Sequence, residues 1–359
     1  MKQTDRFKKE RVIKKTLIFE IIIHKCIKMS FSRDLQFDGL KFVLMFLVIL
    51  GHLTFYDYGI GVKRMIYSFH MPVFVFLSGY FTSLSQNKEK RFKWIKKTLI
   101  LYIVAQVSVI LLRMLLSLTG YVFKGYEFHL SSYLNWHNLI CPEFALWYLV
   151  CLLYWRITIW TIGNRIKEFP LFFVSIIAAI LMGYIPLGYE FSFQRAFAFF
   201  PFFMLGIVFK KRALIEKMKR IPILYAVTGL IIGLIAARQM PSYLPVNHYG
   251  SWKDLSLRTT QMFLGLGLCL IIVRVSRNRF TELFAKYGSK TLWIYIGHIY
   301  LIILGETVFH HFRWTFDVFV AIIIDVLYCL FLIILANKYE ALIKNKSREP
   351  SKINFSRNY

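Results

Sequence analysis

The chain has 359 residues, of which 57% are hydrophobic and 18% aromatic, and its formal net charge is +27. A soluble protein of this length normally forms about two domains with a polar surface. Here the hydrophobic residues instead form long runs, many of which reach the roughly 20 residues needed to cross a bilayer. Continuous apolar runs predict helices, because barrel strands alternate polar and apolar residues. We therefore expect an all-α integral membrane protein, and no nucleic-acid partner for the basic charge.

Residues 1–32 form a basic N-terminal extension that is too charged to span a bilayer. This segment either lies on the membrane surface or is not translated, because Met29 is a second plausible start. No cleavable signal peptide is visible. The five cysteines have no metal-type spacing, and four of them fall in or beside apolar runs. The five are Cys26, Cys141, Cys151, Cys269 and Cys329. We expect buried hydrophobic thiols and no metal site.

Residues 33–336 read as one membrane domain with about ten spans, and residues 337–359 form a basic tail. Basic loops stay on the cytoplasmic side of a membrane, so the Lys and Arg residues test this topology. With a cytoplasmic N-terminus, 35 of the 46 lie in cytoplasmic segments, 5 in the opposite loops and 6 inside spans. We therefore expect both termini in the cytoplasm, a multi-pass protein of the inner cell membrane, and anionic lipids around its basic loops. The expected spans are 40–57, 66–84, 98–119, 143–163, 169–187, 194–210, 221–238, 255–275, 288–308 and 315–336.

The first span, "DGLKFVLMFLVILGH", contains Lys41 at its start and His52 near its end. Eleven residues of α-helix make three turns plus about 20°, so both side chains share one face, with His52 about 16 Å deeper. Asp38 lies close to the same face and can orient Lys41. Considered by itself, Lys41 can be explained as a side chain that extends back to the lipid headgroups. A buried imidazole is costly in lipid, however, and indicates a polar cavity in which it can act as a general base.

Other ionisable groups fall in the outer halves of later spans. Each has an ordinary explanation by itself: Trp147 as an interfacial aromatic residue, Arg195 as a side chain that reaches outward, and His298 as a helix–helix contact. Together they predict a polar cavity that opens toward the outer side. These residues are His70 in the second span, Glu143 and Trp147 in the fourth, Arg195 in the sixth, His298 and Glu306 in the ninth, and Asp325 in the tenth.

A second, cationic entrance is expected at the cytoplasmic end, from Lys41 and the run "KEKRFKWIKK" at 88–97. Such an entrance suits a donor rich in phosphate, such as an acyl-coenzyme A, because Lys and Arg bind phosphate well. A deep histidine suits deprotonation of a hydroxyl that attacks an acyl carbonyl. No GxSxG, P-loop, HExxH or paired-cysteine motif argues for another chemistry.

Five segments between residues 33 and 302 resemble acyltransferase family 3, the ten-span membrane O-acyltransferases, and most of all its fucose 4-O-acetylase-type sugar acetyltransferases. They are "RDLQFDGLKFVLMFLVILGH", "FHMPVFVFLSGYF", "ALWYLVCLLYWR", "RAFAFFPFFMLGI" and "GSKTLWIYIGHIYL". The resemblance implies transfer of an acetyl or other acyl group from acyl-CoA to a surface polysaccharide or lipid-linked sugar. It also implies that His52 is essential and that Lys41 engages the donor. The paired arginines and proline that the family usually has after its second span are Trp94, Lys97 and Leu101 here.

We accordingly expect His52 to be the general base, with His70 or Arg195 stabilising the oxyanion. Trp147 and the aromatic sixth span either stack on a sugar ring or pack in the core. The alternative function is a glycolipid transporter or flippase, which polar midplane groups and Pro-interrupted helices would also suit, although no symmetric pair of broken helices is evident. The expected donor-binding residues are Asp38, Lys41, Arg91, Lys93, Lys96 and Lys97, and the expected acceptor-binding residues are Glu143, Trp147 and His298.

Overall fold

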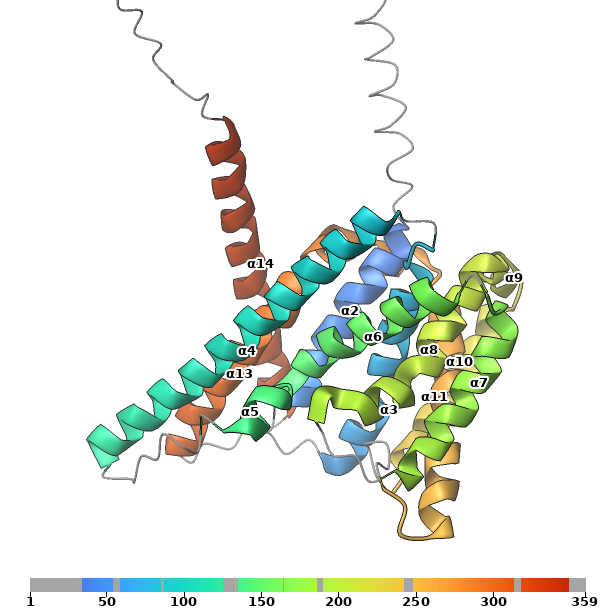
Figure 1. The fold of residues 1–359 in the computed structure, drawn as a ribbon, viewed down its shortest axis with the longest axis horizontal. Coiled ribbons are helices and arrows are strands. Elements are labelled where there is room, and N and C mark those ends of the chain that lie inside the picture. Colours follow the sequence, from blue (N-terminus) through green and yellow to red (C-terminus); the bar gives the residue numbers. More distant parts are fainter. Residues whose placement is uncertain are drawn as a thin grey trace, which may run out of the picture.

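The computed structural model describes residues 34–53, 59–84, 87–124, 133, 135–163, 165–185, 190–241, 248–312 and 318–348. The predicted basic extension and residues 349–359 of the predicted tail lie outside this part of the chain. Within the described residues the protein is all-α and has no β-strand (Figure 1).

Eight helices of the described chain are long and apolar enough to cross a membrane. Two shorter apolar helices, α7 (Glu168–Leu181) and α10 (Ile223–Arg238), occupy the fifth and seventh expected spans. Each of the ten predicted spans therefore corresponds to an apolar helix, which confirms an all-α integral membrane protein. The side on which the termini lie stays a prediction. The eight long helices are α2 (Leu35–His52), α3 (Gly59–Tyr80), α4 (Lys88–Lys124), α6 (Trp147–Ile162), α8 (Phe193–Lys211), α11 (Trp252–Val275), α13 (Thr291–Phe312) and α14 (Val318–Arg348).

Two helices extend beyond their predicted limits. α4 begins at Lys88, so the basic run that we expected before the third span is part of the helix. α14 continues to Arg348, through most of the expected tail. A hydrophobic pattern ends where charges begin, but a helix continues there because Lys, Arg and Glu are good helix formers. The short connecting elements are α5 (Trp136–Ile140), η2 (Phe144–Leu146), η3 (Met182–Tyr184), η4 (Glu190–Ser192), α9 (Leu214–Met218), α12 (Arg279–Glu282) and η5 (Ala285–Lys290).

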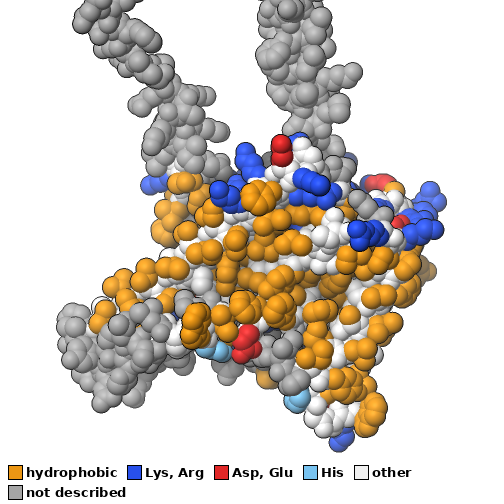
Figure 2. Space-filling model, in the orientation of Figure 1, with side chains coloured by type: hydrophobic (Ala, Val, Ile, Leu, Met, Phe, Trp, Pro, Cys, Tyr) orange, Lys and Arg blue, Asp and Glu red, His pale blue; other side chains and the backbone are white. Residues whose placement is uncertain are grey.

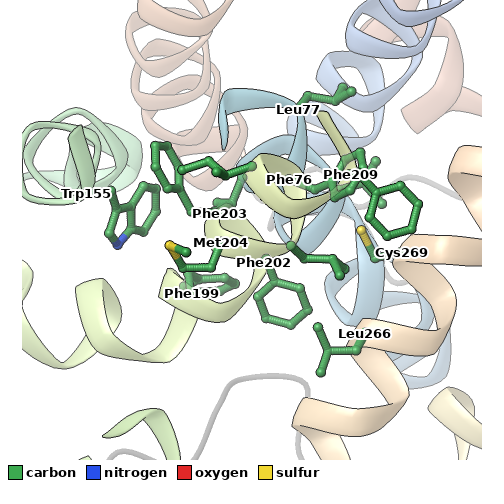
Figure 3. Packing of buried hydrophobic residues seen from close by; sticks show 14 of the residues in the cluster. Phe76, Leu77, Trp155, Phe199, Phe202, Phe203, Met204, Phe209, Leu266 and Cys269 are labelled. Carbon is green, nitrogen blue, oxygen red and sulfur yellow. The ribbon is translucent and has the colours of Figure 1, made fainter. Parts of the chain in front are cut away.

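α3 and α8 pack tightly along a seam that we define by Phe76, Gly79, Phe203 and Gly206. Phe76 and Phe203 are fully buried, and further aromatic side chains surround them (Figure 3). A Cβ atom at Gly79 would collide with the Phe203 carbonyl oxygen, and one at Gly206 would collide with the Phe76 carbonyl oxygen. The two glycines therefore allow the backbones to approach closely. The indole nitrogen of Trp155 donates to the Ala196 carbonyl (2.8 Å), which fixes α6 against α8.

The start of α2 is held by the segment before α13. The Asp34 carboxylate caps α2 by accepting from the Phe37 amide (3.1 Å), and Arg277 donates to both of its oxygens (2.7 Å). A Cβ atom at Gly288 in η5 would collide with the Asp38 carbonyl. These contacts fix where the first turns of α2, and hence Lys41, lie in the bundle.

Charged and hydrophobic surface side chains lie at different levels along the bundle. Figure 2 shows Lys and Arg gathered at one end, over the start of α4 and around α9, and hydrophobic side chains across the middle. Outward-facing hydrophobic residues of the helices include Phe173, Ile232 and Ile323, each more than half exposed (58%, 62% and 58%). Such a band is what contact with lipid tails requires. The four described cysteines are buried free thiols, as expected.

Candidate active site

A cavity of about 530 Å³ lies inside the bundle, between α2, α3, α6, α8, α11 and α13. Lys41 and Gly288 line one end, which is the end where α2 begins. His52 and His70 line the middle, and Arg64 lines the other end, where α3 begins. A cavity with several of the predicted polar residues in its lining therefore exists and runs lengthwise through the bundle. Its opening toward the outer side stays a prediction.

Lys41 and His52 share one face of α2, as their spacing predicts, and both line the cavity. The Lys41 ammonium lies 3.0 Å from a carboxylate oxygen of Asp38 and 4.0 Å from the centre of the Phe81 ring. Asp38 is buried and does not line the cavity. Its carboxylate therefore positions Lys41 at the cavity end.

Two aromatic side chains contact the His52 ring, and the contact with Tyr67 favours one tautomer. The Tyr67 hydroxyl donates to the Gly51 carbonyl (3.2 Å) and lies 3.4 Å from His52 Nδ1. Because the hydroxyl proton points to Gly51, its oxygen can accept from an Nδ1–H, which leaves the lone pair on Nε2. The Phe144 ring packs against the imidazole, with 4.6 Å between ring centres. His52 is thus prepared to accept a proton at Nε2.

Two more histidines lie beside His52. His70 Nδ1 is 2.7 Å from the Ile66 carbonyl, and His298 Nδ1 is 3.2 Å from the Ile294 carbonyl. A carbonyl only accepts, so both Nδ1 atoms carry hydrogen, and in the neutral rings both Nε2 atoms carry a lone pair. His70 lines the cavity, whereas His298 is fully buried behind His52, with 5.9 Å between their ring centres. In this tautomer, His70 cannot donate to an oxyanion, which leaves Arg195 as the better candidate.

Arg195 and Trp147 line the cavity together, from α8 and α6. The guanidinium carbon lies 5.4 Å from the Trp147 ring, and that ring stacks on Phe199 at 5.2 Å. Trp147 is therefore both a core residue and part of the cavity wall. The Tyr148 and Ser78 hydroxyls, 2.5 Å apart, add polar groups nearby.

The charged side chains of the cavity lining are all cationic. Among the described residues no Asp or Glu lines it. Such a wall attracts anionic ligands, because unlike charges interact strongly where water is scarce. We did not select Arg64, Arg156 and Arg258 from the sequence. Arg156 and Arg258 could have been found, because a charged residue inside a membrane span indicates a functional site. The cationic residues of the lining are Lys41, Arg64, Arg156, Arg195 and Arg258.

Several residues that we selected from the sequence lie away from the cavity. Glu143 pairs with Arg113 (3.3 Å), and Arg91 donates to the carbonyls of Trp160 (3.1 Å) and Leu84 (2.9 Å). The lysines at 93, 96 and 97 are exposed on α4. None of these side chains lines the cavity, and neither does His298. Their donor-binding and acceptor-binding roles stay predictions.

The sequence matches a known protein family over most of its length. Residues 34–336 match the family described as "Acyltransferase domain". Over 60 residues the chain is 43% identical to "Nodulation protein NolL" of Mesorhizobium japonicum, a match that covers 14% of this chain and 16% of that protein. No solved structure matches. Because the family match covers most of the sequence, the chain belongs to acyltransferase family 3 and is a multi-pass membrane protein.

Proposed function

We propose that this protein resides in the inner cell membrane and transfers an acetyl group from acetyl-CoA to a hydroxyl of a surface polysaccharide or lipid-linked sugar. The observation that supports this most is the cavity itself, which joins Lys41 to His52 and has five cationic residues in its lining. Coenzyme A carries several phosphate charges, and its thioester lies at the end of a long flexible arm. A cationic end and a buried base along one channel suit both parts of this donor.

The donor enters at the Lys41 end in this proposal. Its phosphates bind Lys41 and Arg156, since Lys and Arg are the common phosphate ligands. The pantetheine arm then follows the face of α2 toward His52, about 16 Å further along the helix. The Asp38–Lys41 ion pair holds the ammonium at the entrance before the donor arrives.

His52 then acts as the general base. Its Nε2 takes the proton of the acceptor hydroxyl while the hydroxyl oxygen attacks the thioester carbonyl. The negative charge that develops on the carbonyl oxygen is stabilised by the Arg195 guanidinium. When the tetrahedral intermediate collapses, the carbon–sulfur bond breaks and the coenzyme A thiolate takes the proton back from His52. The acetyl ester and free coenzyme A are the products.

The acceptor approaches from the opposite end. Arg64 and Arg258 line that end, and the Trp147 ring offers an apolar face on which a sugar can stack. Two arginines suit an acceptor with a phosphate, as in a lipid-linked sugar, because a guanidinium binds phosphate with two parallel hydrogen bonds. The resemblance to fucose 4-O-acetylase-type enzymes supports a sugar hydroxyl as the acceptor.

Purified protein in detergent tests this proposal with radiolabelled acetyl-CoA. Release or transfer of the label should fall by about 10²–10⁴-fold in His52→Ala, the range for loss of a general base. His248→Ala, which removes an exposed histidine outside the cavity, should leave the rate unchanged. Equal rates for His52→Ala and the parent protein, with intact helix content, would refute the role of His52. Glycolipid movement across proteoliposomes without acetyl-CoA would favour the alternative of a transporter.

A further inference from the structure

Three metal-ligating side chains converge outside the cavity. His137 lies in α5, Cys141 follows it, and Glu190 begins η4. Their ligand atoms all lie within 4.8 Å of one another. Cys141 Sγ and His137 Nδ1 are 3.5 Å apart. Two ligands of one tetrahedral ion with bonds of about 2.0–2.3 Å are separated by a similar distance.

The segment with His137 and Cys141 is held rigidly by Gln106 of α4. The Gln106 amide donates to the carbonyls of Asn138 (2.8 Å) and Cys141 (3.0 Å) and accepts from the Glu143 amide (2.9 Å). Gln106 is buried, so these hydrogen bonds are sheltered from water. The backbone that carries the two ligands is thus held by the protein scaffold, which favours ion binding because less of the segment has to be ordered.

Glu190 reaches the cluster from a different part of the bundle. The next residues, Phe191 and Ser192, have φ angles of 47° and 57°, a conformation that non-glycine residues adopt at a cost. Among the described residues, Glu190 has no Lys or Arg partner within ion-pair distance. A cation at the cluster would offset the negative charge of this carboxylate.

We propose that His137, Cys141 and Glu190 bind a Zn²⁺ ion. Imidazole, thiolate and carboxylate are all zinc ligands, and three protein ligands leave the fourth position of a tetrahedral site for water. Binding displaces the thiol proton of Cys141 to solvent. This inference departs from our expectation of no metal, and it does not depend on the acyltransferase reaction.

The ion would connect two segments that lead into the cavity wall. Cys141 lies three residues before Phe144, whose ring packs on His52, and Glu190 lies five residues before Arg195. Bound zinc would therefore fix the spacing between the starts of α6 and α8. Its role in this proposal is to join these two segments, and the resulting effect is on stability and on the geometry of this cavity end.

Cobalt titration of the full-length protein tests the site. The protein is purified in detergent without a histidine tag, treated with a chelator and titrated with Co²⁺. One equivalent should produce a thiolate-to-cobalt charge-transfer band, which Zn²⁺ then removes by displacement. Cys141→Ser should abolish the band. Cys151→Ser is the control and should retain the band. Cys151 is a buried thiol, and among the described residues it belongs to no cluster of possible metal ligands.

Stability gives an independent readout. Zn²⁺ should raise the melting temperature of the chelated parent protein, since a ligand that binds only the folded state stabilises it. His137→Ala removes an exposed side chain, so it should fold normally and bind Zn²⁺ at least about tenfold more weakly. The proposal is overturned if the parent binds no equivalent of Co²⁺. It is equally overturned if Cys141→Ser and His137→Ala bind as the parent does, which would leave the 3.5 Å contact as an S–H···N hydrogen bond.

Discussion

One side of α3 lines the cavity, and its other side packs against α8. Tyr67 and His70 face the cavity, where polar groups and cations gather. Phe76 and Gly79 face the α3–α8 seam, where two backbones touch without polar side chains between them. The seam sets the distance between α3 and α8, and both helices also contribute residues to the cavity. Substitutions on the two sides should therefore change different measurements, activity on one and stability on the other.

Arg195→Gln should give the largest effect on the cavity side. Loss of a donor to the oxyanion typically lowers kcat by about 10²–10³-fold, which corresponds to about 3–4 kcal/mol of transition-state stabilisation. Because Arg195 also lies over Trp147, the melting temperature should be measured alongside the rate of labelled-acetyl transfer. An unchanged kcat would remove Arg195 from the proposed mechanism.

Gly79→Ala should give the largest effect on the seam side. The new methyl group meets the Phe203 carbonyl, so the helices must separate, at a cost of about 1–3 kcal/mol for overpacking. Gly267→Ala in α11 is the matched control, because a Cβ atom there has nothing within 4 Å. Thermal melting in detergent should separate the two variants. Equal melting temperatures would mean that the seam adapts and does not set the helix spacing.

Lys41→Gln should weaken donor binding by about tenfold, equivalent to about 1.5 kcal/mol for a hydrogen bond to a charged group. We expect this as a rise in KM for acetyl-CoA with little change in kcat. Lys93→Gln is the comparison, since this lysine is exposed on α4 outside the cavity. If Lys93→Gln raised KM as much as Lys41→Gln, the basic run of α4 would share the donor site, as the sequence alone led us to expect.

Tyr67→Phe should give the smallest effect, a fall in kcat by about two- to tenfold, from the loss of one hydrogen bond of about 0.5–1.5 kcal/mol. Without the hydroxyl, the Nδ1–H of His52 loses its acceptor and the imidazole is free to change tautomer. Tyr300→Phe is the control, because the Tyr300 hydroxyl pairs with Ser108 (2.5 Å) away from the cavity. Equal rates in both variants would show that Tyr67 does not fix the His52 tautomer.

The sequence predicted the helices well because each span is a local pattern. Length and hydropathy located ten apolar runs, and the structure has an apolar helix at each. Helix ends were predicted less well. α4 begins ten residues before the expected 98, at Lys88, because charged residues end an apolar run without ending a helix.

The site was predicted best along a single helix, although ionisable and aromatic groups inside later spans also pointed to His70, Trp147 and Arg195 in the lining. Lys41 and His52 share a face because both lie on α2, so the periodicity of one helix was enough. Arg64 and Arg258 come from α3 and α11, and the rotation of each helix about its axis depends on packing that no local pattern reports. The pairing of Glu143 with Arg113 (3.3 Å) was missed for the same reason.

The two short helices α7 and α10 have a consequence for the surrounding lipid. α7 has 14 residues and continues through η3 to Tyr184, and α10 has 16 residues. They are about 27 and 24 Å long, less than the roughly 30 Å of hydrocarbon in a typical bilayer. A bilayer accommodates such a mismatch by thinning locally. Both helices lie on the flank of the bundle formed with α11 (Figure 1), and Ala237 at the end of α10 lines the cavity near Arg64. On that flank, headgroups would sink toward the cavity end, so an acceptor anchored by a lipid tail would have less depth to cross than elsewhere around the protein.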